Sequence, residues 1–345
     1  MGCSDGRPRF KKIKELDNHN ILIYSDLDKK EYDLKIIRTV TEQTVKFNNE
    51  IKILKKFNHP NIIKLKGVFI SSLKKNLYII TEYADDGDLQ MKLDEHKRNG
   101  EHFQENQIID WLMQICLALE YIHEQKVIHR NIKPSSIFCM KKGFVKLGDF
   151  GIAKLLENPL NKTSTFINNN MYLAPEIINK EDYSFEVDIW DLGITFYQLM
   201  FFQFPFEGKD ISEIYDNILE GKKVKINNNY NYSPKLIELI NKMISKRKEE
   251  RPTLEEILKG NLFKSRKESY LIENEFVNEK ANWEIENYEN KNKRKIKKEI
   301  NESVLLETFE YDDEDNYEIS TENEKLNEEK NYQFYRVMTL INEKI

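Results

Sequence analysis

Two short segments of the chain bring charged and amide side chains together. The first is His129-Arg130-Asn131-Ile132-Lys133, and the second, Lys146 to Gly151, contains Asp149. An ammonium group such as that of Lys133 can bind phosphate, and a carboxylate such as that of Asp149 can bind a hard metal ion. The amide of Asn131 is neutral and cannot accept a proton at neutral pH. Groups of these kinds can support binding or catalysis once the fold brings the two segments together.

Several other chemistries find no support in the sequence. The histidines lack metal-ligand spacing and no pair of cysteines suggests zinc. The three cysteines (Cys3, Cys116 and Cys139) are widely scattered, which argues against a disulfide framework and favours a reducing compartment. The basic cluster Lys291–Lys298 could be a nuclear-import or nucleic-acid patch, but its acidic neighbours favour a solvated linker. We therefore expect no nucleic acid as a partner.

The elements that must position these side chains change along the chain. Alternating apolar residues predict short strands at Ile21–Tyr24, Tyr32–Ile37 and Leu77–Thr81, with a helix at Val45–Phe57 between the last two. After Gly87 the pattern is helical. One apolar stripe contains Trp111, Ile115, Leu119 and Ile122, and Ile189–Met200 is apolar almost all round, as a buried helix is. A small strand-rich lobe therefore precedes a larger helical lobe.

Charge divides the chain a second time. The 345 residues carry 54 Lys+Arg and 59 Asp+Glu, a formal net charge of −5. Residues 266–345 alone hold 13 Lys+Arg and 21 Asp+Glu and contain no Gly or Pro, which is typical of a solvated segment. The sequence predicts a disordered leader at 1–9, one domain at 10–264 and a charged, mostly disordered tail at 265–345. No stretch of the chain is long and apolar enough to span a membrane.

Five motifs in order resemble those of eukaryotic protein kinases. They are His129-Arg130-Asn131-Ile132-Lys133-Pro134, Lys146-Leu147-Gly148-Asp149-Phe150-Gly151, Ala174-Pro175-Glu176, Asp188-Ile189-Trp190-Asp191-Leu192-Gly193 and Arg251-Pro252. The residues of these motifs are similar to those of the Ser/Thr branch and, within it, of the NIMA-related kinases. The resemblance implies an α+β, bilobal protein-kinase fold, with a β-rich N-lobe at about 10–84 and a helical C-lobe at about 85–264.

The resemblance also implies roles for single residues. Lys35 and Glu50 match the pair that holds the nucleotide phosphates, and Glu82 and Ala84 lie in the hinge that binds the adenine of ATP. Asp149 matches a ligand of Mg²⁺, and Lys133 a phosphate-binding residue of the catalytic loop. Glu176 and Arg251 match a buried ion pair, and Asp188 a brace for the catalytic loop.

Four parts of the catalytic machinery depart from the family. Asn131 stands where the family has its catalytic Asp, and loss of a positioned base costs on the order of 10²–10⁴ in rate. Ser136 replaces the second metal ligand, a doubtful substitute because its side chain is shorter. Asp17, His19 and Leu22 occupy the positions of the phosphate-binding glycines, and Asp33 takes the place of a small residue beside adenine. Asn169 replaces the Thr that bridges the catalytic Asp and Lys.

Two functions remain open. The first is a pseudokinase of the Ser/Thr type that acts as a scaffold or allosteric partner for proteins, with weakened binding of ATP and Mg²⁺. The second is an active ATP-dependent Ser/Thr kinase with atypical catalytic residues, since phosphoryl transfer depends mainly on positioning and electrostatics.

Weaker signals lie outside these motifs. Met1-Gly2-Cys3-Ser4, followed by basic residues, suggests acylation at Gly2 and Cys3, with a disordered leader as the alternative. We expect a cytoplasmic protein that is associated with membranes only if these residues are acylated. Thr163–Thr165 could carry phosphate that pairs with Arg130, or form an exposed loop. The apolar spacing in Tyr332–Ile345 predicts a short terminal helix.

Overall fold

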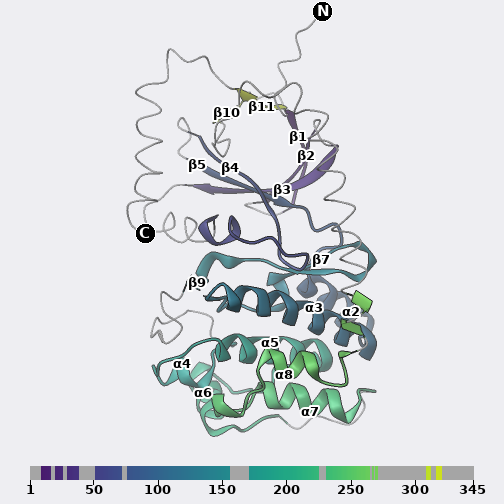
Figure 1. The fold of residues 1–345 in the computed structure, drawn as a ribbon, viewed down its shortest axis with the longest axis vertical. Helices are drawn as coiled ribbons and strands as arrows, with labels where there is room; N and C mark the ends of the chain where they lie inside the picture. The colour runs from purple at the N-terminus through teal and green to yellow at the C-terminus, as the bar shows by residue number, and fades with distance from the viewer. Residues whose placement is uncertain are drawn as a thin grey trace, which may run out of the picture. The chain divides into compact units, whose positions relative to one another are not determined.

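The computed structural model describes residues 9–16, 20–25, 29–38, 51–71, 76–155, 171–224, 231–264, 266–267, 269–270, 308–311 and 316–320. The chain divides into two compact units (Figure 1). The first, rich in strands, comprises Met1–Lys55, Lys64–Tyr83 and Glu302–Ile345, and the second, mostly helical, comprises Lys56–Ile63 and Ala84–Asn301. This division confirms the α+β class and the order of the two predicted lobes.

The strand-rich unit is built on one antiparallel sheet with the order β10-β11-β1-β2-β3-β5-β4. Its strands are β1 (Arg9–Glu15), β2 (Asn20–Ser25), β3 (Lys30–Arg38), β4 (Leu65–Ser71), β5 (Asn76–Glu82), β10 (Thr308–Tyr311) and β11 (Asn316–Ser320). The predicted strands at Ile21–Tyr24, Tyr32–Ile37 and Leu77–Thr81 fall within β2, β3 and β5 and are confirmed.

Alternation along the strands explains why this sheet is buried on both faces. Successive side chains of a strand point to opposite faces, so β5 contributes to both of the clusters that flank the sheet. One face packs residues of β2, β3 and β5 together: Ile21, Ile23, Tyr32, Leu34, Tyr78 and Ile80. On the other face Leu77, Ile79 and Val68 pack against Ile51, which belongs to the helical residues 51–54. The rest of the predicted helix, up to residue 50, lies outside the described residues.

Two strands of the tail extend the sheet. β11 pairs antiparallel with β1, so that Arg9 faces Glu318 and Lys11 faces Asn316. β10 then pairs with β11. The free hydrogen-bonding edge of β1 is thereby covered, which is how sheets avoid pairing with other chains. The prediction of a mostly disordered tail did not include these strands, because their charged sequences carry little apolar signal. The predicted helix at 332–345 lies outside the described residues.

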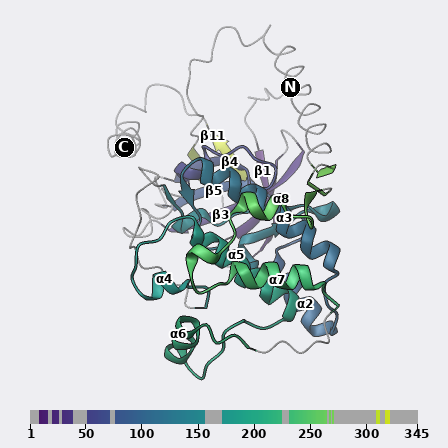
Figure 2. The same ribbon diagram turned by 60° about the horizontal axis from the view of Figure 1, so that its bottom comes forward.

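The helical unit contains α2 (Leu89–Asn99), α3 (Glu105–Glu124), α4 (Pro175–Ile178), α5 (Glu186–Phe201), α6 (Ile211–Glu220), α7 (Pro234–Met243) and α8 (Leu254–Lys259). Between α3 and α4 come the short strands β6 (Val127–Ile128), β7 (Ile137–Cys139), β8 (Val145–Leu147) and β9 (Lys154–Leu155). Helix α3 packs against both α5 and α8, and α5 packs against α7 (Figures 1 and 2). None of the described helices is long and apolar enough to cross a bilayer.

Helix α5 is the centre of this unit. Every residue from Val187 to Phe201 is buried, as its all-round apolar pattern predicts. Gly193 lets α7 approach closely, because a Cβ there would lie 2.6 Å from Cγ2 of Ile244. The predicted stripe on α3 is also confirmed, since Trp111, Ile115, Leu119 and Ile122 are all buried.

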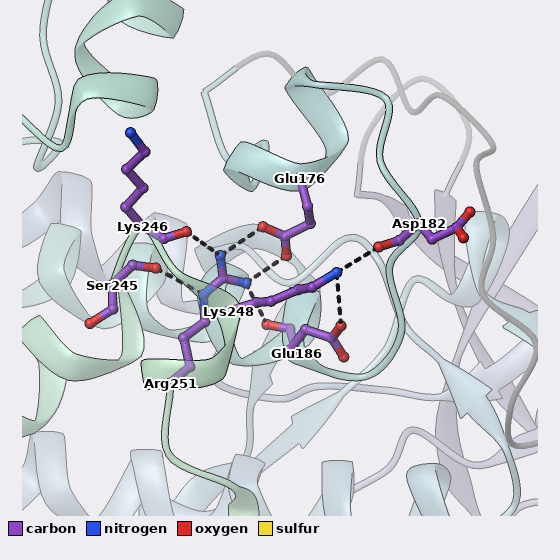
Figure 3. Close-up of polar contacts among 7 residues, drawn as sticks. All are labelled: Glu176, Asp182, Glu186, Ser245, Lys246, Lys248 and Arg251. Atoms are coloured by element: carbon purple, nitrogen blue, oxygen red, sulfur yellow. Dashed lines mark hydrogen bonds and ion pairs between the residues drawn. The ribbon is translucent and has the colours of Figure 1, made fainter.

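A buried ion pair joins distant segments of the helical unit, as the resemblance implied. The guanidinium of Arg251 donates to both carboxylate oxygens of Glu176 at 2.6 and 2.7 Å, and its Nε donates to the carbonyl of Ser245 (Figure 3). Beside it, Lys248 donates to the carbonyl of Asp182 and lies 4.0 Å from the carboxylate of Glu186 (Figure 3). The two cations together tie three separate segments of the chain.

The boundaries of the helical unit differ from the prediction at both ends. Residues 56–63 belong to it although they precede β4, because Phe57 packs edge-on against Tyr121 and Phe150. Beyond residue 264, Arg266 donates to Asp110 and Asn106 of α3. The packed chain therefore continues past the predicted domain end, at least to Tyr270, which is buried.

Candidate functional site

The loop between β6 and the 3₁₀ turn Pro134–Ser136 carries the first group of predicted residues. Asp188, in the first turn of α5, holds this loop: its carboxylate accepts the N–H groups of His129 at 2.9 Å and Arg130 at 2.8 Å. Arg130 has a φ of 64°, a strained value for a residue with a side chain, so the two bonds fix a backbone that would otherwise relax. The predicted bracing role of Asp188 is confirmed.

His123 completes the support beneath the loop. Its Nε2 lies 2.8 Å from Oδ2 of Asp188. Burial alone would raise the pKa of Asp188, but the hydrogen bond and charge of His123, with the bond from Arg130, hold it below its usual value. Nearby, burial and the charge of Asp188 raise the pKa of the buried Asp191 carboxyl well above its usual range. Neither His123 nor Asp191 was singled out from the sequence, although a carboxylate inside an apolar helix is a visible signal.

His129 links the loop to the segment that contains Asp149. Its Nδ1 accepts the N–H of Asn131 at 3.3 Å, so Nε2 carries the proton and donates to the carbonyl of Gly148 at 2.9 Å. Complete burial lowers the pKa of His129, which keeps the ring neutral in this role. The two predicted segments are therefore joined by a buried neutral imidazole.

Asn131 and Asp149 are in direct contact. Nδ2 of Asn131 donates to Oδ2 of Asp149 at 2.6 Å, and Asn131 is only 8% exposed. Asp149 itself has a left-handed backbone, with φ 60° and ψ 54°. The preceding residue, Gly148, leaves no room for a side chain, because a Cβ there would lie 2.6 Å from Cε2 of Phe138 and 3.1 Å from Cγ1 of Ile63.

Ser136 has its hydroxyl turned toward its own turn. The hydroxyl accepts the N–H of Lys133 at 3.0 Å and donates to the carbonyl of the same residue at 2.8 Å. The residue is fully buried, whereas Lys133 is half-buried. Metal ligation by Ser136 stays a prediction, and these two bonds count against it. No group of three or more His, Cys, Asp or Glu side chains able to hold a metal ion occurs among the described residues.

The remaining predicted residues belong to the strand-rich unit. Lys35 lies on β3 opposite Ile79, and one carboxylate oxygen of Asp33, two residues earlier, is buried. Glu82, at the end of β5, accepts the N–H of Lys64 at 2.7 Å, while Ala84 begins the helical unit. Glu50, Asp17, His19, Thr163–Thr165 and Asn169 lie outside the described residues. The structure thus brings together Asn131, Lys133, Ser136 and Asp149, and the roles of the other residues stay predictions.

This fold and this arrangement of loops define a protein kinase domain. The family model described as "Protein kinase domain" matches residues 21–263, more than half of the chain, so the chain belongs to that family.

Among its relatives, the chain is 34% identical over 254 residues to serine/threonine-protein kinase Nek1 of Mus musculus, which covers 73% of this chain and 21% of that protein. It is 36% identical over 210 residues to Nek4 of Mus musculus, which covers 61% of this chain and 26% of that protein. It is 38% identical over 213 residues to Nek5 of Homo sapiens, with 61% and 29% covered. The chain therefore spans less than a third of the length of these relatives. The predicted likeness to NIMA-related Ser/Thr kinases is confirmed.

Proposed function

We propose that this chain is a protein kinase domain that has lost most of its phosphoryl transfer and acts on protein partners through its surfaces and conformational states. The observation that carries the proposal is the hydrogen bond from Nδ2 of Asn131 to Asp149. A proton acceptor is needed where the substrate hydroxyl is deprotonated. The amide of Asn131, held on Asp149, is neutral and cannot take up that proton. Loss of such a group costs on the order of 10²–10⁴ in rate, or ~3–5 kcal/mol of barrier.

Nucleotide binding is retained in this proposal, but weakened. Mg²⁺ usually keeps several waters and takes one or two protein carboxylates together with the phosphates of the nucleotide. Asp149 fits that requirement as a single carboxylate ligand, and Lys133, two residues after Asn131 in the same loop, would bind phosphate. Bound Mg²⁺ would supply charge neutralisation for the phosphates. Because the amide of Asn131 already uses Oδ2 of Asp149, a cation must compete with that hydrogen bond.

A second candidate function is an active ATP-dependent Ser/Thr kinase. The named relatives are serine/threonine-protein kinases at 34–38% identity, and Asp149 keeps the family position next to Gly148 and Phe150. Since phosphoryl transfer depends mainly on positioning and electrostatics, transfer without a base at residue 131 is chemically accessible at a reduced rate.

One experiment separates the two candidates. Transfer of radiolabelled γ-phosphate to dephosphorylated casein is measured for the full chain and for Asp149→Ala, which removes the only carboxylate that the proposal gives to the metal. Thermal-shift titrations with ATP, with and without Mg²⁺ or Mn²⁺, are run on the same two proteins. A metal-dependent shift with no transfer above the Asp149→Ala background supports the first function. Transfer far above that background, without the loss on the order of 10²–10⁴ that removal of a base produces, supports the second.

The cellular setting is part of the proposal. Cys116 and Cys139 are free, buried thiols. The wide scatter of the three cysteines along the chain supports our proposal of a reducing, cytoplasmic setting. Membrane association would depend on acylation at Gly2 and Cys3, supported by the exposed Lys11 and Lys14 of β1. Comparison of wild type with Gly2→Ala in a membrane-fractionation assay tests this part separately.

A further inference from the structure

Tyr270 lies outside the part of the chain that the kinase family model matches, yet it is integrated into the helical unit. The match ends at residue 263, whereas Tyr270 is only 7% exposed. Its ring packs 5.9 Å from that of Phe144, and its hydroxyl donates to Oδ1 of Asn61 at 2.8 Å. Because the hydroxyl of Tyr270 is buried, it depends on Asn61 rather than on water for this hydrogen bond.

Asn61 is the centre of a buried network that requires this hydroxyl. The side chain is fully buried, and its Nδ2 donates to Oε1 of Gln114 at 3.0 Å and to the carbonyl of Val145 at 2.9 Å. Both protons of the amide are thereby used. The amide cannot turn over to satisfy Oδ1 without losing both bonds, so the hydroxyl of Tyr270 is the partner that completes Asn61.

The network holds strand β8 from the side opposite β7. Gln114 Oε1 accepts the N–H of Val145 at 2.9 Å, and the carbonyl of Asn61 accepts the N–H of Leu147 at 2.8 Å. The other edge of β8 pairs with β7, where Ile137 faces Leu147. β8 ends two residues before Asp149, with the closely packed Gly148 between them. The backbone of Asp149 therefore follows a strand whose edge opposite β7 is hydrogen-bonded through Asn61 and Gln114.

Arg266 and Lys267 anchor the same segment to α3. The guanidinium of Arg266 donates to Asp110 at 2.5 Å and to the side chain of Asn106 at 2.6 Å, and Lys267 lies 3.9 Å from the carboxylate of Glu120. Arg266 and Lys267 each face an acidic side chain of α3, so the segment is held to that helix at two points. These contacts place Tyr270 where its hydroxyl reaches Asn61.

We propose that Tyr270 is a positioning residue for Asp149, which it supports through Asn61 and strand β8. The segment 266–270 is then a functional part of the kinase domain. The effect on nucleotide binding rests on the proposed role of Asp149, whereas the effect on β8 does not.

The test compares Tyr270→Phe with Tyr232→Phe in the full chain. Tyr232 is a matched control: it is 8% exposed and its hydroxyl donates to the carbonyl of Phe103, which lies before α3 and outside β8, at 2.9 Å. Hydrogen–deuterium exchange is measured at the amides of Val145 and Leu147 and, for reference, throughout α7. We expect Tyr270→Phe to speed exchange at Val145 and Leu147 by about tenfold and to leave α7 unchanged, as loss of one buried hydrogen bond does locally. Tyr232→Phe should leave Val145 and Leu147 at the wild-type rate.

Unchanged exchange at Val145 and Leu147 in Tyr270→Phe would overturn the proposal. Equal acceleration by both variants would also overturn it, because the effect would then be general destabilisation. Arg266→Ala, which keeps the hydroxyl but frees the segment from α3, provides an independent arm and should accelerate the same two amides.

A thermal-shift titration with ATP and Mg²⁺ supplies the functional readout. Tyr270→Phe should reduce the metal-dependent shift, and Tyr232→Phe should not. If the wild type itself shows no shift, the proposed nucleotide binding fails, while the exchange comparison still decides whether Tyr270 positions β8.

Discussion

Nδ2 of Asn131 lies 2.6 Å from Oδ2 of Asp149, so an uncharged donor hydrogen-bonds the carboxylate that the kinase family uses for its metal. The two side chains satisfy each other without nucleotide, because the amide of Asn131 donates a hydrogen bond that the carboxylate of Asp149 accepts. A catalytic Asp at residue 131 would instead place two carboxylates side by side. Two adjacent carboxylates repel unless a cation or a shared proton lies between them, whereas the present pair needs neither.

Restoring the carboxylate at residue 131 should therefore restore chemistry. Asn131→Asp is expected to raise the rate of phosphate transfer to casein by about 10²–10⁴, the usual contribution of a positioned acid–base group. The same variant should have a lower melting temperature without Mg²⁺ and recover it when Mg²⁺ and ATP are added. Asn131→Ala, which supplies neither donor nor acceptor, is the control for the transfer assay. A transfer rate in Asn131→Asp no higher than in Asn131→Ala would show that residue 131 does not limit the reaction.

The buried pair of Arg251 and Glu176 should contribute strongly to stability. Both side chains are at most 3% exposed, so Arg251→Met leaves a buried carboxylate without its partner (Figure 3). The expected loss in the free energy of unfolding is ~3–5 kcal/mol, measured by urea denaturation. Lys242→Met is the control, since Lys242 and Glu238 form an exposed pair at 2.8 Å whose loss should change the free energy of unfolding far less. Equal losses in the two variants would contradict the predicted difference between buried and exposed pairs.

His59 should make the stability of the helical unit depend on pH. Its Nδ1 accepts the N–H of Asn61 at 3.1 Å, and burial, with the charge of Lys146, lowers the pKa of His59 to about 4. Because the pKa of the folded form lies below that of the unfolded form, this contribution is complete above about pH 6.5 and is lost as the pH falls toward 4.

Wild type should lose up to ~2 kcal/mol of unfolding free energy from this residue between pH 7 and pH 5. His59→Asn keeps an acceptor for the N–H of Asn61 and does not titrate in this range, so its stability should fall less steeply. The measurement is urea denaturation at a series of pH values. Parallel pH profiles for the two proteins would show that His59 is not responsible.

Gly148 should be essential for the placement of Asp149. In Gly148→Ala the new Cβ would lie 2.6 Å from the ring of Phe138, and overpacking of this kind costs ~1–3 kcal/mol. The expected result is a lower melting temperature and a smaller metal-dependent shift with ATP. Phe138→Leu added to Gly148→Ala should recover part of both, with Phe138→Leu alone as the control. A double variant no better than Gly148→Ala would place the strain elsewhere.

Local patterns predicted much of the fold. The strands β2, β3 and β5 follow from alternating Ile, Leu and Tyr residues, and α5 follows from an apolar pattern on all sides. The pairing of Glu176 with Arg251, and of Asp188 with its loop, follows from the motifs of a known family. These features depend on residue type and spacing, which a single sequence displays directly.

The parts that were missed depend on long-range contacts. His123 and Asp188 are separated by 65 residues, and the backbone of α3 must be placed before their contact can be inferred. The segment 266–270 was assigned to the tail because its charges resemble those that follow, yet Arg266 uses its charge to bind Asp110 and Asn106. Strands β10 and β11 were missed for a similar reason, since Glu318 pairs in the sheet opposite Arg9.

The hydrogen bond between Tyr270 and Asn61 also has a consequence for biosynthesis. The two residues are separated by 209 positions, and a ribosome that adds ~5–20 residues per second needs ~10–40 s to make that interval. During this time the buried acceptor of Asn61 has no Tyr270 to complete it. We therefore expect this part of the helical unit to stay open, or solvated, in the nascent chain until residues 266–270 have left the ribosome.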